Sequence, residues 1–396
     1  MRALRQRDGT HAHGAGRGAA IVVALLSLVC LAGSHNASVP KAHTAVDRFV
    51  PDDTAGGSGW AAVQWNFAGP FGVGAPAAWA HLIAAGAPGG AGVTVAVLDT
   101  GVGSSNQSPS PAPSDLTAAQ LVPGWDFVDN DADPYDEHGH GTQVASTIVE
   151  DTNNAFGLTG LAYGARIMPI RVFNSHGIGD VDTVARGIRF AADHGAKVLN
   201  LSFAFGAGVT EADISPVLGS LEYAARRGAL IVGAAGNEGT GSIDLPARSR
   251  HVLAVGATTE FGCVAAYSNY GPELDLVAPG GGADAPIQDS NCKAGRQGRG
   301  IHQLDQFGTG SGSVGTSMAV PHVSATAALV VASRVVGQDP TAAQIATRLK
   351  HTARDLGAPG YDERYGWGLV SAGAATASTA RGAAVRSTYP RGGRPE

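Results

Sequence analysis

The sequence predicts an α/β fold of three layers, in which helices cover both faces of a mostly parallel sheet. Two observations lead to this prediction: short β-branched apolar runs recur along the chain, and helical stretches separate them. Each run is apolar at consecutive positions, as strands buried on both faces are. In such folds, functional side chains gather at the carboxyl ends of strands.

The elements alternate in order along the chain. The predicted strands are Val93–Leu98, Arg166–Arg171, Lys197–Leu201, Ala229–Ala234, Val252–Val255 and Leu274–Ala278. The helices between them include Val181–His194 and Ser215–Arg227, and Gly195 and Gly228 are placed as their C-terminal caps. No internal repeat is visible.

Composition excludes some classes of function. The chain has 396 residues, of which 44% are hydrophobic, so it can bury a large core. The formal net charge is −6 and only 15% of the residues are charged, which offers no basic footprint for nucleic acid. We therefore expect no nucleic-acid partner.

The N-terminus predicts a secretory signal peptide over residues 1–34. Four arginines precede the apolar run Ala19–Ala32, and the small residues Gly33 and Ser34 follow it. The run is short for a membrane span, which needs about 20 apolar residues. We expect a secreted, extracellular protein without a stable membrane anchor. Residues 35–63 are predicted to be a short pro-segment or linker, and 376–396 a disordered tail.

The cysteines are consistent with secretion. Cys30 would leave with the signal peptide, so Cys263 and Cys292 would remain in the mature protein. An even pair in an oxidising compartment favours one disulfide. The alternative is two unrelated thiols.

Four short motifs contain polar side chains that could perform chemistry. Asp99 ends a buried strand in "VLDTGV", and His140 lies between glycines in "GHGT". Asn237 follows a buried strand in "AAGNEG", and Ser317 opens a helical run in "GTSMAVPH". Each has an ordinary structural interpretation, such as a turn carboxylate, a surface histidine, a turn asparagine or a helix cap. Together, acid, histidine and serine are the parts of an acyl-transfer triad.

The four motifs, in the order Asp, His, Asn, Ser, resemble those of the subtilisin family of serine proteases. The resemblance extends over residues 64–375 and implies a peptidase domain there. It also excludes an α/β-hydrolase esterase, in which the serine precedes the acid and the histidine. The resemblance implies a serine endopeptidase acting on polypeptides, in which Ser317 is the nucleophile and His140 the general base and acid. Asp99 would orient His140, and Asn237 would bind the oxyanion.

The resemblance also implies a substrate-binding strand in "NLSFAFG". Ser202, Phe203 and Ala204 stand where the family pairs with the substrate backbone, and Glu238 stands beside the primary pocket. The family has two glycines where Ala204 and Phe205 stand here, which predicts a reshaped pocket. Leu245–Pro246 aligns with a cis peptide bond.

Structural calcium is the one cofactor we expect, and none for catalysis. Acidic side chains cluster before the catalytic histidine, in a stretch that resembles a calcium loop of thermophilic members: Asp126, Asp129, Asp131 and Asp133. Asn154 matches the strong calcium loop of the family, with Asp115 and Gln64 as possible co-ligands. The alternative is a solvated acidic loop.

Three functions remain open on the sequence alone. The first is an active secreted endopeptidase, which we expect to be a monomer. The second is a non-enzymatic binding protein on the same scaffold, which would need a broken triad. The third is a processing protease tied to one partner, suggested by the short pro-segment and the altered pocket.

Overall fold

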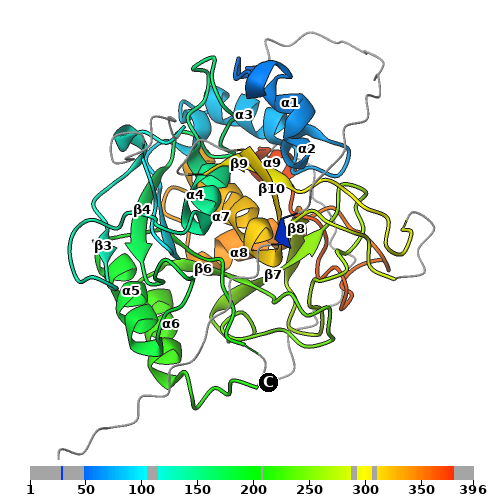
Figure 1. Ribbon diagram of the computed structural model, residues 1–396. Coiled ribbons are helices and arrows are strands. Elements are labelled where there is room, and N and C mark those ends of the chain that lie inside the picture. The colour runs from blue at the N-terminus through cyan, green and yellow to red at the C-terminus, as the bar shows by residue number, and fades with distance from the viewer. Residues whose placement is uncertain are drawn as a thin grey trace, which may run out of the picture.

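A parallel sheet of seven strands forms the centre of the fold, in the order β3-β4-β2-β5-β6-β7-β8 (Figure 1). The computed structural model describes residues 28–29, 49–104, 115–206, 208–286, 292–305 and 310–378. The strands are β2 (Thr94–Asp99), β3 (Trp125–Asp126), β4 (Arg166–Arg171), β5 (Val198–Leu201), β6 (Leu230–Ala234), β7 (Val252–Thr258) and β8 (Leu276–Pro279). All six predicted strands are therefore present within a few residues, and the two-residue β3 is an addition.

Side chains of the central strands point alternately into two cores. Along β2, Val95 and Val97 belong to one apolar cluster, whereas Ala96 and Leu98 belong to the other. This alternation follows from the two-residue period of a strand. It explains why the predicted runs are apolar at consecutive positions, because both faces of the sheet are covered.

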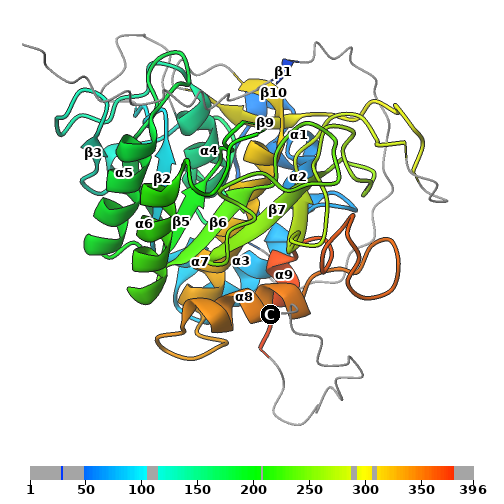
Figure 2. The same ribbon diagram turned by 90° about the horizontal axis from the view of Figure 1, so that it is seen from below.

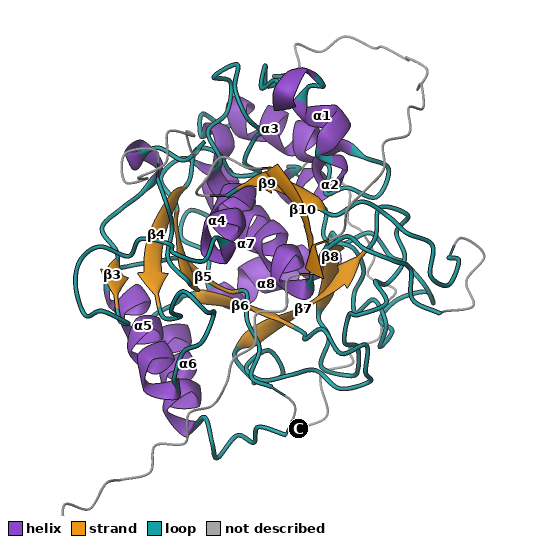
Figure 3. Cartoon of the chain, in the orientation of Figure 1, coloured by secondary structure: helices purple, strands orange, loops and turns teal. Residues whose placement is uncertain are grey.

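Helices cover both faces, as the sequence predicted. Figure 3 shows α5 and α6 outside the curve of the sheet, and α4, α7 and α8 inside it. The helices are α1 (Trp60–Val63), α2 (Trp65–Ala68), α3 (Ala75–Ala84), α4 (His140–Val149), α5 (Val181–Asp193), α6 (Ser215–Arg226), α7 (Thr316–Ser333), α8 (Ala342–His351) and α9 (Ala372–Thr376). Gly195 and Gly228 follow α5 and α6 with φ angles of 79° and 88°, the left-handed conformation expected of a C-terminal cap.

Helix α7 lies against β5, β6, β7 and β8 of the sheet, and it also contacts β2 (Figure 2). Its side chains from Thr316 to Val330 are all buried, and most of them are apolar. Its length and composition alone would suit a membrane span, but 89% of its apolar window lies inside the protein. Among the described residues it is the single helix of this kind, and it is a core helix.

A second, antiparallel sheet has the order β1-β10-β9, with β1 (Leu28–Val29), β9 (Ile301–Leu304) and β10 (Gly310–Val314). Strand β1 is the one part of the predicted signal peptide among the described residues. Strand β10 ends three residues before Ser317.

Residues 49–63, part of the stretch predicted as a short pro-segment or linker, pack against the rest of the fold. Trp60 is 4% exposed, donates from Nε1 to the carbonyl of Pro51, and packs edge-on against Trp79. Phe49 contacts Trp79 as well. Large aromatic side chains bury much apolar surface, so this segment belongs to the packed domain. The predicted tail lies outside the described residues beyond 378.

Two local predictions are confirmed. Cys263 and Cys292 form a disulfide with a Cα–Cα distance of 5.6 Å. The Leu245–Pro246 peptide bond is cis.

Candidate active site

Asp99 and His140 form a buried pair at the carboxyl edge of the sheet. Asp99 is the last residue of β2 and His140 the first of α4, and the two side chains are fully buried or nearly so. His140 Nδ1 lies 2.7 Å from Asp99 Oδ1. The same carboxylate oxygen accepts from the backbone N–H of Thr100 at 2.8 Å. The Asp99 carboxylate thus fixes the orientation of the His140 ring through Nδ1 and leaves Nε2 as the second ring nitrogen.

Asp136 organises the start of α4 around His140. Its carboxylate accepts from the backbone N–H groups of His138, Gly139 and Thr142, at 2.8 to 2.9 Å. It also accepts from the hydroxyls of Thr100 and Thr142, at 2.8 and 2.6 Å. Unpaired N–H groups at a helix start need such an acceptor. Asp136 is therefore a positioning residue that the motif search overlooked.

The electrostatic environment suits His140 to accept a proton. Burial lowers the pKa of His140, but attraction to Asp99, their hydrogen bond and the charge of Asp136 outweigh it, so the pKa is raised above its ordinary value. The other ring nitrogen, Nε2, is buried and has no hydrogen-bond partner among the described residues. A buried basic nitrogen without a partner is available for proton transfer.

Ser317 is the second residue of α7 and is 6% exposed. Gly315 lies two residues before Ser317, and a Cβ atom at Gly315 would lie 3.0 Å from Ser317 Oγ. Pro321 lies inside this helix. Because proline has no N–H, the carbonyl of Ser317 lacks its partner four residues on. The hydroxyl of Ser202 donates to that carbonyl at 2.8 Å instead.

Asn237 lies beside Ser317, in the turn after β6. Its side-chain oxygen accepts from the backbone N–H and from the hydroxyl of Thr316, at 2.8 and 2.9 Å. These bonds fix the amide, so its nitrogen faces away from Thr316. A Cβ on Gly315 would lie 3.8 Å from that nitrogen and 3.0 Å from Ser317 Oγ. The amide N–H and the helix start are suited to stabilise negative charge near Ser317.

Tyr267 holds the segment before the nucleophile. Its hydroxyl donates toward the carbonyls of Gly280 and Gly281, at 2.8 and 3.0 Å, and accepts from the N–H of Gly315 at 3.0 Å. Tyr267 and Thr316 were not among the residues that the motifs indicated, and only the folded chain shows their hydrogen bonds in the site.

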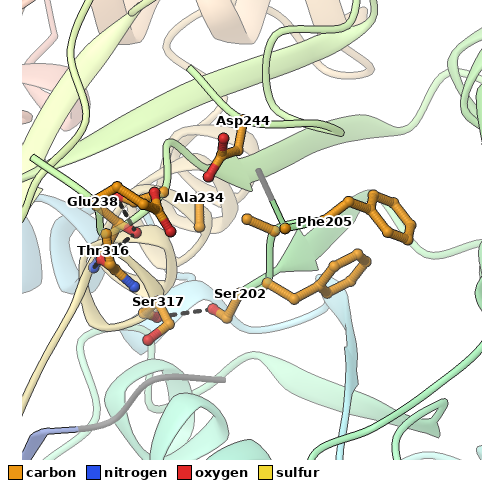
Figure 4. Close-up of a pocket in the computed structure, with 12 residues that line it drawn as sticks. Ser202, Phe205, Ala234, Glu238, Asp244, Thr316 and Ser317 are labelled. Carbon is orange, nitrogen blue, oxygen red and sulfur yellow. Dashed lines mark hydrogen bonds between the residues drawn. The ribbon is translucent and has the colours of Figure 1, made fainter. Parts of the chain in front are cut away.

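A pocket of about 40 Å³ adjoins Ser317 (Figure 4). It is lined by Ser202, Phe203, Ala204, Phe205, Gly206, Ala234, Gly236, Asn237, Glu238, Asp244, Thr316 and Ser317. The predicted substrate residues thus lie together here. The rings of Phe203 and Phe205 pack into the core with Phe173, and Figure 4 shows Phe205 directed away from Ser317. Asp244, which the sequence analysis did not single out, lies opposite Ser317.

The acidic loop before His140 does not fit a calcium site in this structure. Arg171 of β4 donates to Asp126 at 2.7 Å and to Asp129 at 2.5 Å. Asp126 Oδ1 also accepts two backbone N–H groups, and Asp131 accepts from the N–H of Asp133 at 2.9 Å. No group of three or more acidic, histidine or cysteine side chains within the described ranges is arranged to hold a metal. A cation from a neighbouring strand thus neutralises carboxylates that the prediction assigned to calcium.

Asn154 and Asp115, both predicted to belong to one calcium site, lie close together. The Asn154 amide nitrogen donates to Asp115 Oδ1 at 2.8 Å, and the backbone N–H of Leu158 donates to Oδ2 at 3.2 Å. Both amide atoms of Gln64 bond the backbone of Thr159. Burial, together with the charges of Asp151 and Asp53, raises the pKa of Asp115 to about 7.

Comparisons with known proteins match most of the chain. A family model described as the subtilase family matches residues 90–368. Subtilisin Savinase of Lederbergia lenta is 37% identical over 287 residues, which cover 72% of this chain and 91% of the relative. Thermitase of Thermoactinomyces vulgaris is 35% identical over 292 residues, covering 74% and 90%.

A thermophilic serine proteinase of Bacillus sp. (strain AK1) is 34% identical over 283 residues, or 70% of this chain, and the match spans only 60% of that relative. A solved structure from work on proteases of Pseudoalteromonas arctica PAMC 21717 superposes with a TM-score of 0.64 at 29% identity. It covers 83% of this chain and 99% of that one.

Proposed function

We propose that this chain, which belongs to the subtilase family, is a secreted serine endopeptidase. It would cleave polypeptides through an acyl-enzyme on Ser317. The observation that carries the proposal is the buried Asp99–His140 pair, 2.7 Å apart, whose Nε2 has no partner among the described residues. Helix α4, which begins with His140, packs on α7, which carries Ser317. Members of this family need no catalytic cofactor.

In the proposed reaction, His140 Nε2 takes the proton of Ser317 Oγ as the oxygen attacks the scissile carbonyl carbon. The carbonyl oxygen becomes negative and is bound by the Asn237 amide and the backbone N–H of Ser317. His140 then gives its proton to the leaving amine as the C–N bond breaks. Water, deprotonated by His140, hydrolyses the ester and restores Ser317. Throughout, Asp99 stabilises the charged imidazole.

We propose that the substrate binds as an extended strand along the segment of Ser202, Phe203 and Ala204. That segment follows β5 and lines the pocket beside Ser317. Main-chain pairing of this kind gives affinity, while the pocket selects a side chain. The Ser202 hydroxyl already bonds the Ser317 carbonyl, so its contribution to substrate would come from its main chain.

The decisive experiment compares the protein with Ser317→Ala on a protein substrate and with a serine-directed covalent inhibitor. We expect hydrolysis and labelling of Ser317 in the native chain, and neither in the variant. Asp213→Asn, which changes an exposed carboxylate that caps a surface turn, is the control and should retain both. Peptide hydrolysis that survives Ser317→Ala would refute the nucleophile. A folded native chain that neither cleaves nor is labelled would favour the binding-protein alternative.

We also propose that the chain is exported and acts as a monomer without a membrane anchor. The arginine-rich head and the short apolar run support export, and the Cys263–Cys292 bridge fits an oxidising compartment. N-terminal sequencing of the mature protein from culture medium and its sedimentation behaviour test this. A chain retained with its first 34 residues in the membrane fraction would contradict it.

For calcium, we propose the loop of Asn154. Asp115 lies beside Asn154, and the nearby charges of Asp151 and Asp53 add negative potential without an ion pair among the described residues. Carboxylate and amide oxygens are ligands that calcium takes, although the Asn154 amide must turn to present its oxygen. Chelation should lower the melting temperature of the native chain and have no effect on Asp115→Asn. An identical melting temperature with chelator and with calcium would refute this site.

A further inference from the structure

The pocket beside Ser317 contains two carboxyl groups and no other charged side chain. Figure 4 shows Asp244 across the pocket from Ser317, with Glu238 and Ala234 between them. The rest of the lining is small or neutral, and the Phe205 ring turns away. A side chain entering past Ser317 would therefore meet carboxyl oxygens at the far side.

The fold forces these two carboxyl groups together. Glu238 and Asp244 hydrogen-bond through their side chains. The Asn269 amide nitrogen reaches both, at 2.7 Å from Glu238 Oε2 and 3.4 Å from Asp244 Oδ2. Asn269 also accepts from the backbone N–H of Glu238 at 3.1 Å, which fixes this turn. At Gly236 a Cβ would lie 2.3 Å from Asp244 Oδ2, so any other residue there would displace the carboxyl.

No cation in the described chain neutralises this pair. Neither carboxyl forms an ion pair among the described residues. The charged groups that act on Asp244 are Glu238, from the turn after β6, and Arg248, from the segment before β7. Arg248 donates to the Ile243 carbonyl at 3.4 Å and weakly favours ionisation. Burial and Glu238 raise the pKa of Asp244 to about 7. Near neutral pH Asp244 is partly protonated, and a bound cation could replace that proton.

We propose that this pocket selects a lysine or arginine side chain on the acyl side of the scissile bond, with Asp244 as the main charge partner. The inference rests on the proposed endopeptidase function and names its substrate class. The pocket is lined by Ser202, Ala204 and Ala234 on the way from Ser317 to the carboxyl groups, so a long unbranched side chain could reach Asp244 with its charged end. Glu238 is exposed, so water screens its charge more than that of half-buried Asp244.

The selectivity should increase with pH. Below neutrality Asp244 holds a proton, so the pocket attracts a cation more weakly. As pH rises through about 7, Asp244 ionises and the attraction grows. Deprotonation of His140 also raises activity with pH, but it does so for every substrate. A ratio of two substrates measured at one pH therefore cancels His140 and isolates the pocket.

The test uses peptides that differ only at the residue before the scissile bond: lysine, arginine, norleucine or phenylalanine. Norleucine has the shape of lysine without its charge. For the native chain we expect kcat/KM for lysine to exceed that for norleucine by about tenfold or more near pH 9, and by only a few-fold near pH 6. Comparison of lysine with arginine shows which head group the pocket accommodates better.

Variants assign the effect to the carboxyl. Asp244→Asn should lower kcat/KM for lysine about tenfold, leave norleucine within about threefold, and flatten the pH dependence of their ratio. Asp244→Glu keeps the charge and should retain a lysine preference. Glu211→Gln removes one exposed negative charge outside the pocket lining and should change no ratio.

The outcomes separate the two proposals. If norleucine or phenylalanine peptides are cleaved and lysine is not preferred near pH 9, the pocket inference is wrong and the endopeptidase stands. An unchanged lysine-to-norleucine ratio in Asp244→Asn would overturn it as well. If the native chain cleaves no peptide and Ser317 is not labelled, the proposed function fails first and the inference falls with it.

Discussion

Removal of the Cys263–Cys292 bridge should lower the stability of the whole domain. The bridge joins the segment after β7 to the long segment that precedes β9, and it closes a loop with a sequence separation of 29 residues. Cys263 is fully buried, so replacement of both cysteines by alanine avoids burying a new polar group. The double variant Cys263→Ala/Cys292→Ala is thus the cleanest perturbation.

The size of the effect follows from the length of the closed loop. In the chain-entropy account, a loop of 29 residues reduces the entropy of the unfolded chain by about 12 cal/mol/K, or about 3.6 kcal/mol near room temperature. A domain of about 300 residues unfolds with an entropy of about 0.6 kcal/mol/K, so the melting temperature should fall by about 6 °C.

Other contacts in this region will survive the change. Asp284 accepts from the Thr259 hydroxyl at 2.6 Å and pairs with Arg296 at 2.8 Å, and the Arg296 guanidinium lies 3.5 Å from the centre of the Phe261 ring. These contacts tie the same two segments together in the folded state. Because they persist, we expect the bridge to act mainly on the unfolded chain and the folded loop to keep its place.

The assay is differential scanning calorimetry in a Ser317→Ala background, which prevents self-digestion. Dithiothreitol should lower the melting temperature of the bridged chain toward that of the double variant and leave the variant unchanged. The reasoning is refuted if the variant melts within about 1 °C of its parent, or if dithiothreitol lowers both equally. A loss much above about 5 kcal/mol would show that the folded loop had also collapsed.

Three further predictions concern the catalytic groups. Thr316→Val removes the hydroxyl bond to Asn237 and should lower kcat about three- to tenfold with little change in KM. Thr316→Ser keeps a hydroxyl and should have the native kcat, so equal losses in both variants would contradict the positioning role. The pKa of His140 is raised, and its neutral form is the base. On acidification, kcat/KM for a norleucine peptide should therefore fall with a midpoint above about pH 6.5. A pH–rate profile with a lower midpoint would contradict this. Asp136→Asn places an amide nitrogen against N–H donors at the start of α4. It should lower the free energy of unfolding, measured in urea, by about 1–3 kcal/mol and reduce kcat. An unchanged urea midpoint would show that another acceptor replaces the carboxylate.

Much of the fold could be predicted because its signals are local. A strand buried on both faces is apolar at consecutive central positions, as Ile167–Ile170 are, and β4 was found at Arg166–Arg171 with both ends correct. Glycines with positive φ end α5 and α6, and this requirement is local too. The short strand β3 was missed because two residues cannot show a period.

The acidic loop before His140 has a charge partner that its own sequence does not indicate. Its carboxylates look like calcium ligands when read alone, since nothing nearby in the chain neutralises them. Arg171, more than 40 residues later, reaches Asp126 and Asp129 because β4 lies beside β3 in the sheet. The pairing of the charges depends on strand order, which the loop sequence does not encode.

The sequence by itself determined the alternation of strands and helices, the presence of an acid, a histidine, an asparagine and a serine in subtilase order, and the pair of cysteines. Tertiary structure decided which partners these residues have. It brought Asp244 across from Ser317, placed Asp136 under α4, and set Ser202 against the carbonyl that Pro321 leaves unpaired. The reason is physical. Apolar periodicity and turn formation depend on residues that are close in the sequence, whereas ion pairs and hydrogen bonds join residues that are far apart in the sequence and that the folded sheet brings together.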